Sequence, residues 1–203
     1  MKFLKLCALL GFSFLFSACS FLLPPKESHK KLFFLNNPVA PPVSTKKALS
    51  KTLLVTTIRS PSWLDTHDMA YIQNGNQMNY FAENQWIASP PELLQPIVTQ
   101  ALQNAGIYRI VISQPYSGKY DHALDLQLLN MEQVFNTHPS YYHLTMRVRL
   151  MNALTQKVIA VQTFDIRKQA SRDNPQGGVS AANQAVSQLV TDIIQFVHDY
   201  AKS

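Results

Sequence analysis

The sequence predicts an α+β fold, in which two helices pack on one face of a largely antiparallel or mixed sheet as a two-layer sandwich. Two observations predict it. Strand-like segments flank one amphipathic helical segment, and a second helical segment closes the chain. The length of 203 residues fits one domain with appendages rather than two domains.

The first eighteen residues have the layout of a secretory signal peptide. Two lysines precede an uncharged, mostly apolar run over residues 6–16, and two small residues lead to Cys19. Residues 16–19 resemble a bacterial lipobox, with Phe16 where Leu is usual. The resemblance implies that Cys19 becomes the first mature residue and carries acyl chains, palmitate among them. The alternative is an uncleaved membrane anchor over residues 3–23.

Residues 19–50 are predicted to be a lipidated tether rich in proline and lysine. The run at residues 32–35 has no turn residue and predicts a short strand within the tether. Ser20 follows the cysteine where Asp resembles an inner-membrane retention signal, so we expect attachment to the periplasmic face of the outer membrane. One α+β domain is expected over residues 51–203.

The positive charge is confined to the N-terminal quarter. The chain carries a formal charge of +6, and residues 51–203 hold 11 basic and 11 acidic side chains. Nucleic-acid binding needs a basic face on the folded module. A nucleic-acid partner is therefore not expected, and recognition by shape and apolar contact is favoured over recognition by charge.

Within the domain, the first half predicts a strand, a hairpin, a helix and a strand. The β-branched run 52–59 predicts a buried strand. Segments 69–73 and 77–81 flank Asn74-Gly75-Asn76, which predicts a hairpin turn. Residues 89–105 predict a helix with a capping box from Ser89 and Glu92 and a stop at Gly106, and Pro96 indicates a kink or a later start. Residues 107–113 predict the next strand.

The second half predicts a long hairpin over 122–135 and 141–152, a strand over 156–167 and a helix over 179–201. Alternation along 141–152 places Arg147 and Arg149 on a polar face, opposite an apolar one. Residues 168–178 are expected to form a mobile loop.

The sequence contains no motif that supports catalytic chemistry. Cys7 would leave with the signal peptide and Cys19 would be acylated, so no thiol remains for catalysis or metal binding. The six histidines have no metal-binding spacing, and no nucleotide or nucleophile motif occurs. We therefore expect no enzyme, no cofactor and no metal site.

Aromatic residues gather around the first hairpin and the helix entry. Core packing explains most of them, with Trp86 as the expected core anchor. An exposed aromatic patch for a protein or lipid partner is the alternative. Trp63, Tyr80 and Trp86, together with Arg147 and Arg149, are the candidate contact residues.

The whole pattern resembles the ABC-type transport auxiliary lipoproteins, which include the lipoprotein of the paraquat-inducible (Pqi) system. The resemblance spans roughly residues 31–203, and its distinctive part is 61–94. It starts with Phe33-Phe34-Leu35 and includes Asn84-Gln85-Trp86 before Pro90, with Gln85 where the family usually has Arg.

The resemblance implies a non-catalytic periplasmic component of a lipid-transport or membrane-integrity system. Its partner would be a periplasm-spanning protein with mammalian-cell-entry (MCE) domains and, through it, an inner-membrane permease and ATPase. The alternative is a periplasmic lipoprotein that binds a lipid or amphipath without an MCE partner. A homo-oligomer is compatible with the sequence.

Overall fold

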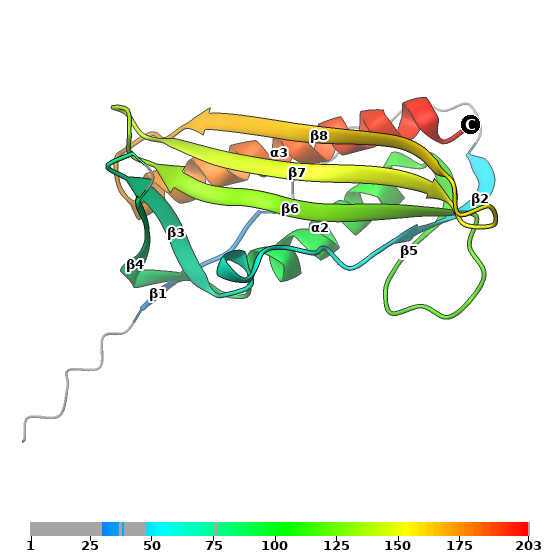
Figure 1. The fold of residues 1–203 in the computed structure, drawn as a ribbon, viewed down its shortest axis with the longest axis horizontal. Coiled ribbons are helices and arrows are strands. Elements are labelled where there is room, and N and C mark those ends of the chain that lie inside the picture. The colour runs from blue at the N-terminus through cyan, green and yellow to red at the C-terminus, as the bar shows by residue number, and fades with distance from the viewer. Residues whose placement is uncertain (1–29, 37, 39–47, 76, 203) are drawn as a thin grey trace, which may run out of the picture.

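The computed structural model describes residues 30–36, 38, 48–75 and 77–202. In this part of the chain, eight strands form one open mixed sheet, and two α-helices lie on the same side of it (Figure 1). This arrangement confirms the predicted α+β class. The signal peptide, Cys19 and most of the tether lie outside the described residues.

The strands and helices occur in the order that the sequence predicts. Their bounds are β1 Lys31–Phe33, β2 Leu49–Val55, β3 Asp68–Gln73, β4 Gln77–Trp86, α2 Pro90–Ala105, β5 Tyr108–Ser113, β6 His122–Val134, β7 Tyr141–Asn152, β8 Val158–Gln169 and α3 Pro175–Tyr200, with a short 3-10 helix at Ser62–Leu64. The predicted strand near 32–35 is β1, which pairs with β4 and so belongs to the sheet.

The long strand β6 organises the sheet because both of its edges are used. One edge pairs with β7 along the whole strand, and β8 continues the sheet beyond β7. The other edge pairs with β2 near its start and with β3 near its end. Between these two partners, Arg59 donates its backbone N–H to Leu126 (3.1 Å) and accepts from the N–H of Leu128 (2.8 Å). The segment after β2 therefore runs along β6 and holds Arg59 at mid-strand.

The sheet is mixed because its hairpins are antiparallel and its long connections are parallel. The β3–β4 and β6–β7–β8 pairs are antiparallel, whereas β2 runs parallel to both β5 and β6. The first hairpin turns at Asn74 and Gly75, which have φ of 52° and 83°. Asn and Gly tolerate this left-handed backbone better than other residues, which confirms the predicted turn.

Helix α2 has the predicted ends. The backbone N–H and hydroxyl of Ser89 both donate to the Glu92 carboxylate, each at 3.0 Å. These hydrogen bonds lower the pKa of Glu92. Gly106 ends the helix in the left-handed conformation (φ 66°). The helix begins at Pro90, so Pro96 lies inside it and does not delay its start.

The prediction of a loop over 168–178 is wrong at its end, because α3 begins at Pro175. The Asn174 side chain accepts a hydrogen bond from the N–H of Gly177 (2.8 Å), and proline occupies the first helical position. Both features are typical of a helix start. The two glycines that follow have low helix propensity and hide this start in the sequence.

The core lies between the two helices and the sheet. Buried apolar residues fill it from the strands (Leu53, Leu124, Leu126, Leu128, Leu144, Met146, Val148, Leu150) and from the helices (Leu94, Val98, Leu102, Ala182, Val186, Leu189, Ile193). These side chains fill the space between the helices and the sheet. In the described part of the chain, the opposite face of β6, β7 and β8 has no helix on it (Figure 1), so polar side chains can lie there.

Candidate functional site

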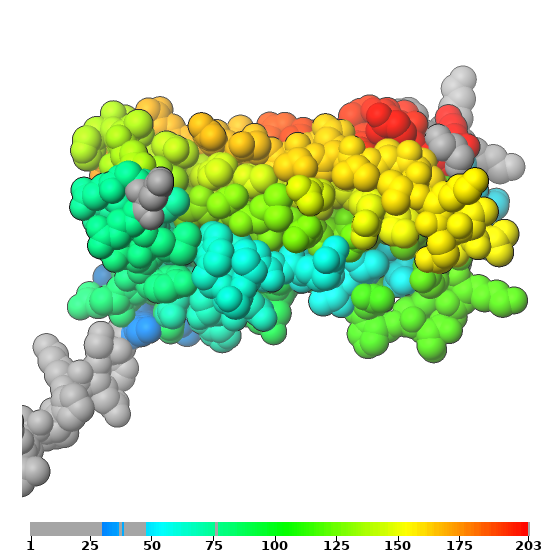
Figure 2. Space-filling view, viewed as in Figure 1, coloured from blue at the N-terminus to red at the C-terminus, as the bar shows by residue number. Residues whose placement is uncertain are grey.

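The helix-free face of the sheet is the one turned to the viewer in Figure 2, and the alternating burial of β7 places polar residues on it. Met146, Val148 and Leu150 have no exposed surface, whereas Arg147 is exposed and Arg149 is half-buried. Strand alternation therefore places both arginines on the same face, as the sequence predicts. Arg147 lies beside Gln127 of β6, and Arg149 lies beside Asp125.

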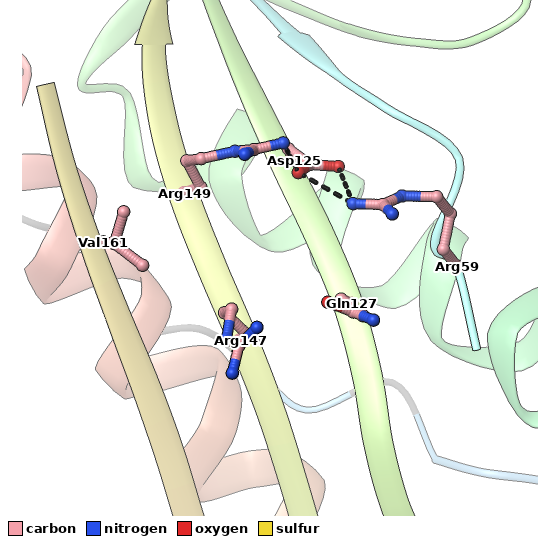
Figure 3. A pocket seen from close by; sticks show the side chains of 6 residues that line it. All are labelled: Arg59, Asp125, Gln127, Arg147, Arg149 and Val161. Atoms are coloured by element: carbon pink, nitrogen blue, oxygen red, sulfur yellow. Dashed lines mark hydrogen bonds and ion pairs between the residues drawn. The ribbon is translucent and has the colours of Figure 1, made fainter. Parts of the chain in front are cut away.

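Asp125 holds two arginines that come from different parts of the chain. Arg59 Nη2 donates to both carboxylate oxygens of Asp125, at 3.1 and 3.0 Å, and Arg149 Nη2 also donates to Oδ2 (Figure 3). Only 14% of the Asp125 side chain is exposed, so these charge-assisted bonds are partly shielded from water. The carboxylate thus holds two guanidinium groups, one from the segment after β2 and one from β7.

Arg147 has a different environment, although the strand register places it in one row with Gln127 and the backbone of Arg59. Among the described residues it has no hydrogen-bond or ion-pair partner, and Figure 3 shows it beside a hollow that Asp125 and Gln127 also line. The hollow has a volume of about 420 Å³. We call its lining the arginine surface, which consists of Arg59, Asp125, Gln127, Arg147, Arg149 and Val161.

The arginine surface has the chemistry of an anion-binding region. The surface contains three guanidinium groups and one carboxylate, which leaves an excess of two positive charges. Arg149 Nε is also buried and has no hydrogen-bond partner within the described part of the chain. Arginine binds carboxylates through paired N–H groups in a fixed plane. The Arg147 guanidinium is therefore available for an acidic group from outside the domain.

A second polar cluster lies on the same face of β6, β7 and β8, centred on His143. Its Nδ1 lies 2.8 Å from Glu132 Oε1, and its Nε2 lies 2.8 Å from Asp165 Oδ1. The hydrogen bond to Glu132 is the main cause that raises the pKa of His143, and Asp165 adds to it. The Glu132 side chain is completely buried, and its Oε2 has no hydrogen-bond partner among the residues described. This cluster joins three strands and is structural in character.

The aromatic candidates divide between core and surface. Trp86 is 1% exposed and lies in the core, as expected for the anchor, so it does not form part of the surface. Tyr80 is 41% exposed, and its hydroxyl donates to the backbone carbonyl of Trp63 at 3.3 Å. Trp63 packs partly against the core. Tyr80 and Trp63 thus contact each other, whereas Arg147 and Arg149 share only a face of β7.

Sequence reasoning missed Arg59 and Asp125 as members of the site. They are 66 positions apart, and the parallel bridge from Arg59 to Gln127 brings them together. For Asp125 a signal was available, because it alternates with the buried leucines of β6 and must face the same side as Arg149. No local pattern gives the position of Arg59, since its segment lies beyond the end of β2.

Two further observations concern ions and membranes. Across the described residues, no group of three or more acidic, histidine or cysteine side chains has a geometry that could hold a metal ion. No helix in this same part of the chain is both long enough and apolar enough to span a bilayer.

Comparison with protein families decides the family. The model of the ABC-type transport auxiliary lipoprotein component matches residues 33–194. The chain belongs to this family. The sequence-based assignment is thereby confirmed, and the family name describes an auxiliary lipoprotein of a transport system, which agrees with a membrane-anchored periplasmic protein. A search of curated proteins finds no match.

Solved structures share the fold of this auxiliary lipoprotein. Protein XCC0632 from Xanthomonas campestris superimposes with a TM-score of 0.77 at 16% identity, over 85% of this chain and 97% of that chain. The protein CT253 from Chlamydia trachomatis superimposes with a TM-score of 0.53 at 9% identity, over 74% of this chain and 97% of that chain. At these identities, the comparisons show the fold alone.

Proposed function

We propose that this protein is a non-catalytic lipoprotein, anchored in the outer membrane through Cys19, that serves an ABC/MCE-type lipid transport or membrane-integrity system. Its role is to dock onto an MCE-domain protein that reaches across the periplasm. Energy then comes from the permease and ATPase at the inner membrane. Family membership supports the auxiliary role.

The observation that carries the docking proposal is Arg147 on the arginine surface, which has no ion-pair partner among the described residues. The folded part of the chain has equal numbers of acidic and basic residues, so a local excess of positive charge is a specific feature. Arg59 and Arg149 are already fixed by Asp125, which reduces the entropy lost when they bind. An acidic segment of the MCE protein fits this surface, so the proposed docking uses a local charge and departs from the sequence-based expectation of recognition by shape and apolar contact.

The filled interface between the helices and the sheet favours docking over lipid storage. The helix residues that face the sheet are buried and pack against buried leucines. Binding a lipid there would require these side chains to move apart. A lipid-binding module without an MCE partner is the alternative function, and cross-linking distinguishes the two.

The test places a photo-crosslinking residue at Gln127 in the full chain and recovers cross-linked products from detergent-extracted membranes. We expect mass spectrometry to find an MCE-domain protein. Arg147→Glu should lower the cross-link yield about tenfold, which corresponds to the loss of about 1.4 kcal/mol. The matched control is Arg109→Glu, which makes the same charge change at an exposed position of β5.

Two results contradict the proposal. Recovery of phospholipid without any MCE-domain protein would support the lipid-binding module instead. Equal cross-link yields for Arg147→Glu and Arg109→Glu would show that the arginine surface is not the docking site, even where the MCE protein is found.

A further inference from the structure

Three large apolar side chains are exposed together at the edge of the sheet beside β1. Leu32 is 60% exposed, Phe34 is 62% exposed, and Ile87 is 55% exposed. Phe33, which lies between Leu32 and Phe34, packs against the core, and Leu35, which follows Phe34, is buried. The alternation of a strand therefore turns Leu32 and Phe34 away from the core.

Ile87 belongs to the same outward face. Phe33 pairs in register with Trp86, and Ile87 donates its backbone N–H to the Phe33 carbonyl at 2.8 Å. Trp86 points into the core, so the next residue points outward beside Phe34. We call Leu32, Phe34 and Ile87 the N-terminal apolar patch.

The patch lies on an edge and has no covering element in the described structure. Among the described strands, β1 pairs only with β4, so it is the terminal strand of the sheet. Exposed large apolar residues that cluster, rather than occur singly, mark a binding surface. Leu32 and Phe34 of the N-terminal apolar patch are not needed for the core, because Phe33 and Leu35 make the contacts with it.

The position of the patch in the chain indicates what covers it. Leu32 follows the proposed lipid anchor Cys19 by only thirteen residues. Even fully extended, such a segment reaches about 45 Å. The patch is thus held close to the bilayer at high effective concentration.

The charges beside the patch fit a lipid surface. Lys31 is exposed next to Leu32, and Lys30 lies 3.5 Å from Asp68, with 40% of its side chain exposed. Apolar side chains flanked by lysines are typical of segments that lie in the interface of an anionic membrane.

We propose that the N-terminal apolar patch seats the domain directly on the bilayer, with Leu32, Phe34 and Ile87 inserted among the lipid headgroups. The acyl chains then act as the anchor and the patch sets the orientation of the domain. This inference rests on the membrane anchoring in the proposed function, and it adds a second, non-covalent membrane contact.

The chain's cysteines make the test simple, because Cys7 and Cys19 are its only two. In the acylated mature protein, Phe34→Cys is labelled with an environment-sensitive fluorophore and incorporated into vesicles of phosphatidylethanolamine and phosphatidylglycerol that contain brominated lipid. The matched control is Tyr116→Cys, an exposed aromatic in the loop between β5 and β6, at the other end of the long axis from β1 (Figure 1). Leu32→Cys repeats the measurement in case Phe34→Cys folds poorly.

We expect brominated lipid to quench the label in Phe34→Cys or Leu32→Cys at least severalfold more than the label in Tyr116→Cys. In one contrary outcome, the protein floats with the vesicles while the labels at Phe34→Cys and Tyr116→Cys are quenched equally weakly. That result would overturn the proposed seating of the patch on the bilayer and leave the lipid anchor intact. Failure of the protein to float would overturn the anchor and the seating together. Disulfide-linked dimers of Leu32→Cys without lipid quenching would assign the patch to a second copy and also overturn the proposal.

Discussion

Glu132 and His143 face each other across β6 and β7, with Glu132 Oε1 2.8 Å from His143 Nδ1. The Glu132 side chain is fully buried, and 17% of the His143 side chain is exposed. Because the carboxylate stabilises the imidazolium, the folded-state pKa of His143 is raised above its usual 6.5. The histidine therefore contributes stability that is present below pH 6.5 and is lost as the pH rises through the folded-state pKa.

This relationship predicts a pH-dependent stability. The free energy of unfolding should fall as the pH rises above 6.5, and His143→Gln should flatten that slope. At low pH the substitution should cost about 1.5–3 kcal/mol, the range for a hydrogen bond to a charged group. Urea unfolding at a series of pH values measures both effects. The control His67→Gln changes an exposed histidine, and an unchanged slope in His143→Gln would contradict the prediction.

Asp125 is predicted to be structural and Arg147 is not. Asp125→Ala leaves Arg59 and Arg149 facing each other without their shared carboxylate, and should lower the free energy of unfolding by about 1.5–3 kcal/mol. Arg147→Ala removes an exposed side chain that has no ion-pair partner among the described residues. It should change the free energy of unfolding by less than about 0.5 kcal/mol. Chemical denaturation compares the two. A large cost at Arg147 would show that this residue serves the fold.

Trp86 is predicted to be the most costly aromatic residue to remove. It is 1% exposed in the core, so Trp86→Ala should destabilise the fold by about 3–5 kcal/mol through lost burial and the remaining cavity. Leu154→Ala is the matched surface truncation, because Leu154 is 93% exposed, and it should have little effect. Thermal unfolding of both variants checks the contrast, and similar melting temperatures would refute the assignment of Trp86 to the core.

Gly177 in the first turn of α3 should not tolerate alanine. A Cβ at this position would overlap backbone atoms of Arg172, which cannot move without shifting the chain. Alanine usually stabilises a helix by about 1 kcal/mol relative to glycine. Here we expect the opposite sign, a loss of about 1–3 kcal/mol from overpacking. Ser180→Ala, exposed on the same helix, is the control in denaturant titrations. Stabilisation by Gly177→Ala would disprove the close approach.

Cys19 is predicted to be the acylation site. Cys19→Ala should abolish incorporation of labelled palmitate and leave the uncleaved precursor, because the modified thiol is missing. Metabolic labelling followed by electrophoresis measures both the label and the size. Cys7→Ala, in the predicted signal peptide, is the control and should retain the label. If Cys19→Ala still carries fatty acid, the lipobox assignment is wrong.

The order of strands and helices was predictable because it depends on local patterns. Alternation along residues 141–152 indicated the two faces of β7, and the capping box indicated the start of α2. The start of α3 was missed because Gly177 and Gly178 lower its helix propensity, whereas the close approach of Arg172 and Gln133 that favours glycine there is a feature of the folded chain. The pairing of β1 with β4 was also missed, since a parallel pair leaves no local mark.

The candidate site was predictable only in part. Arg147 and Arg149 were found because they alternate with buried residues on one strand. Arg59 was not, because its place beside Asp125 depends on a backbone bridge to the middle of β6.

The sequence by itself determined the class of fold, the family and the neutral charge of the domain, because each follows from composition and short-range patterns. Only the tertiary structure decided that Arg59 and Arg149 share the Asp125 carboxylate beside Arg147, and that Leu32, Phe34 and Ile87 lie together at the edge of the sheet. Both arrangements require residues far apart in the chain to pair across strands, and the register of such pairs is set by the packing of the whole sheet.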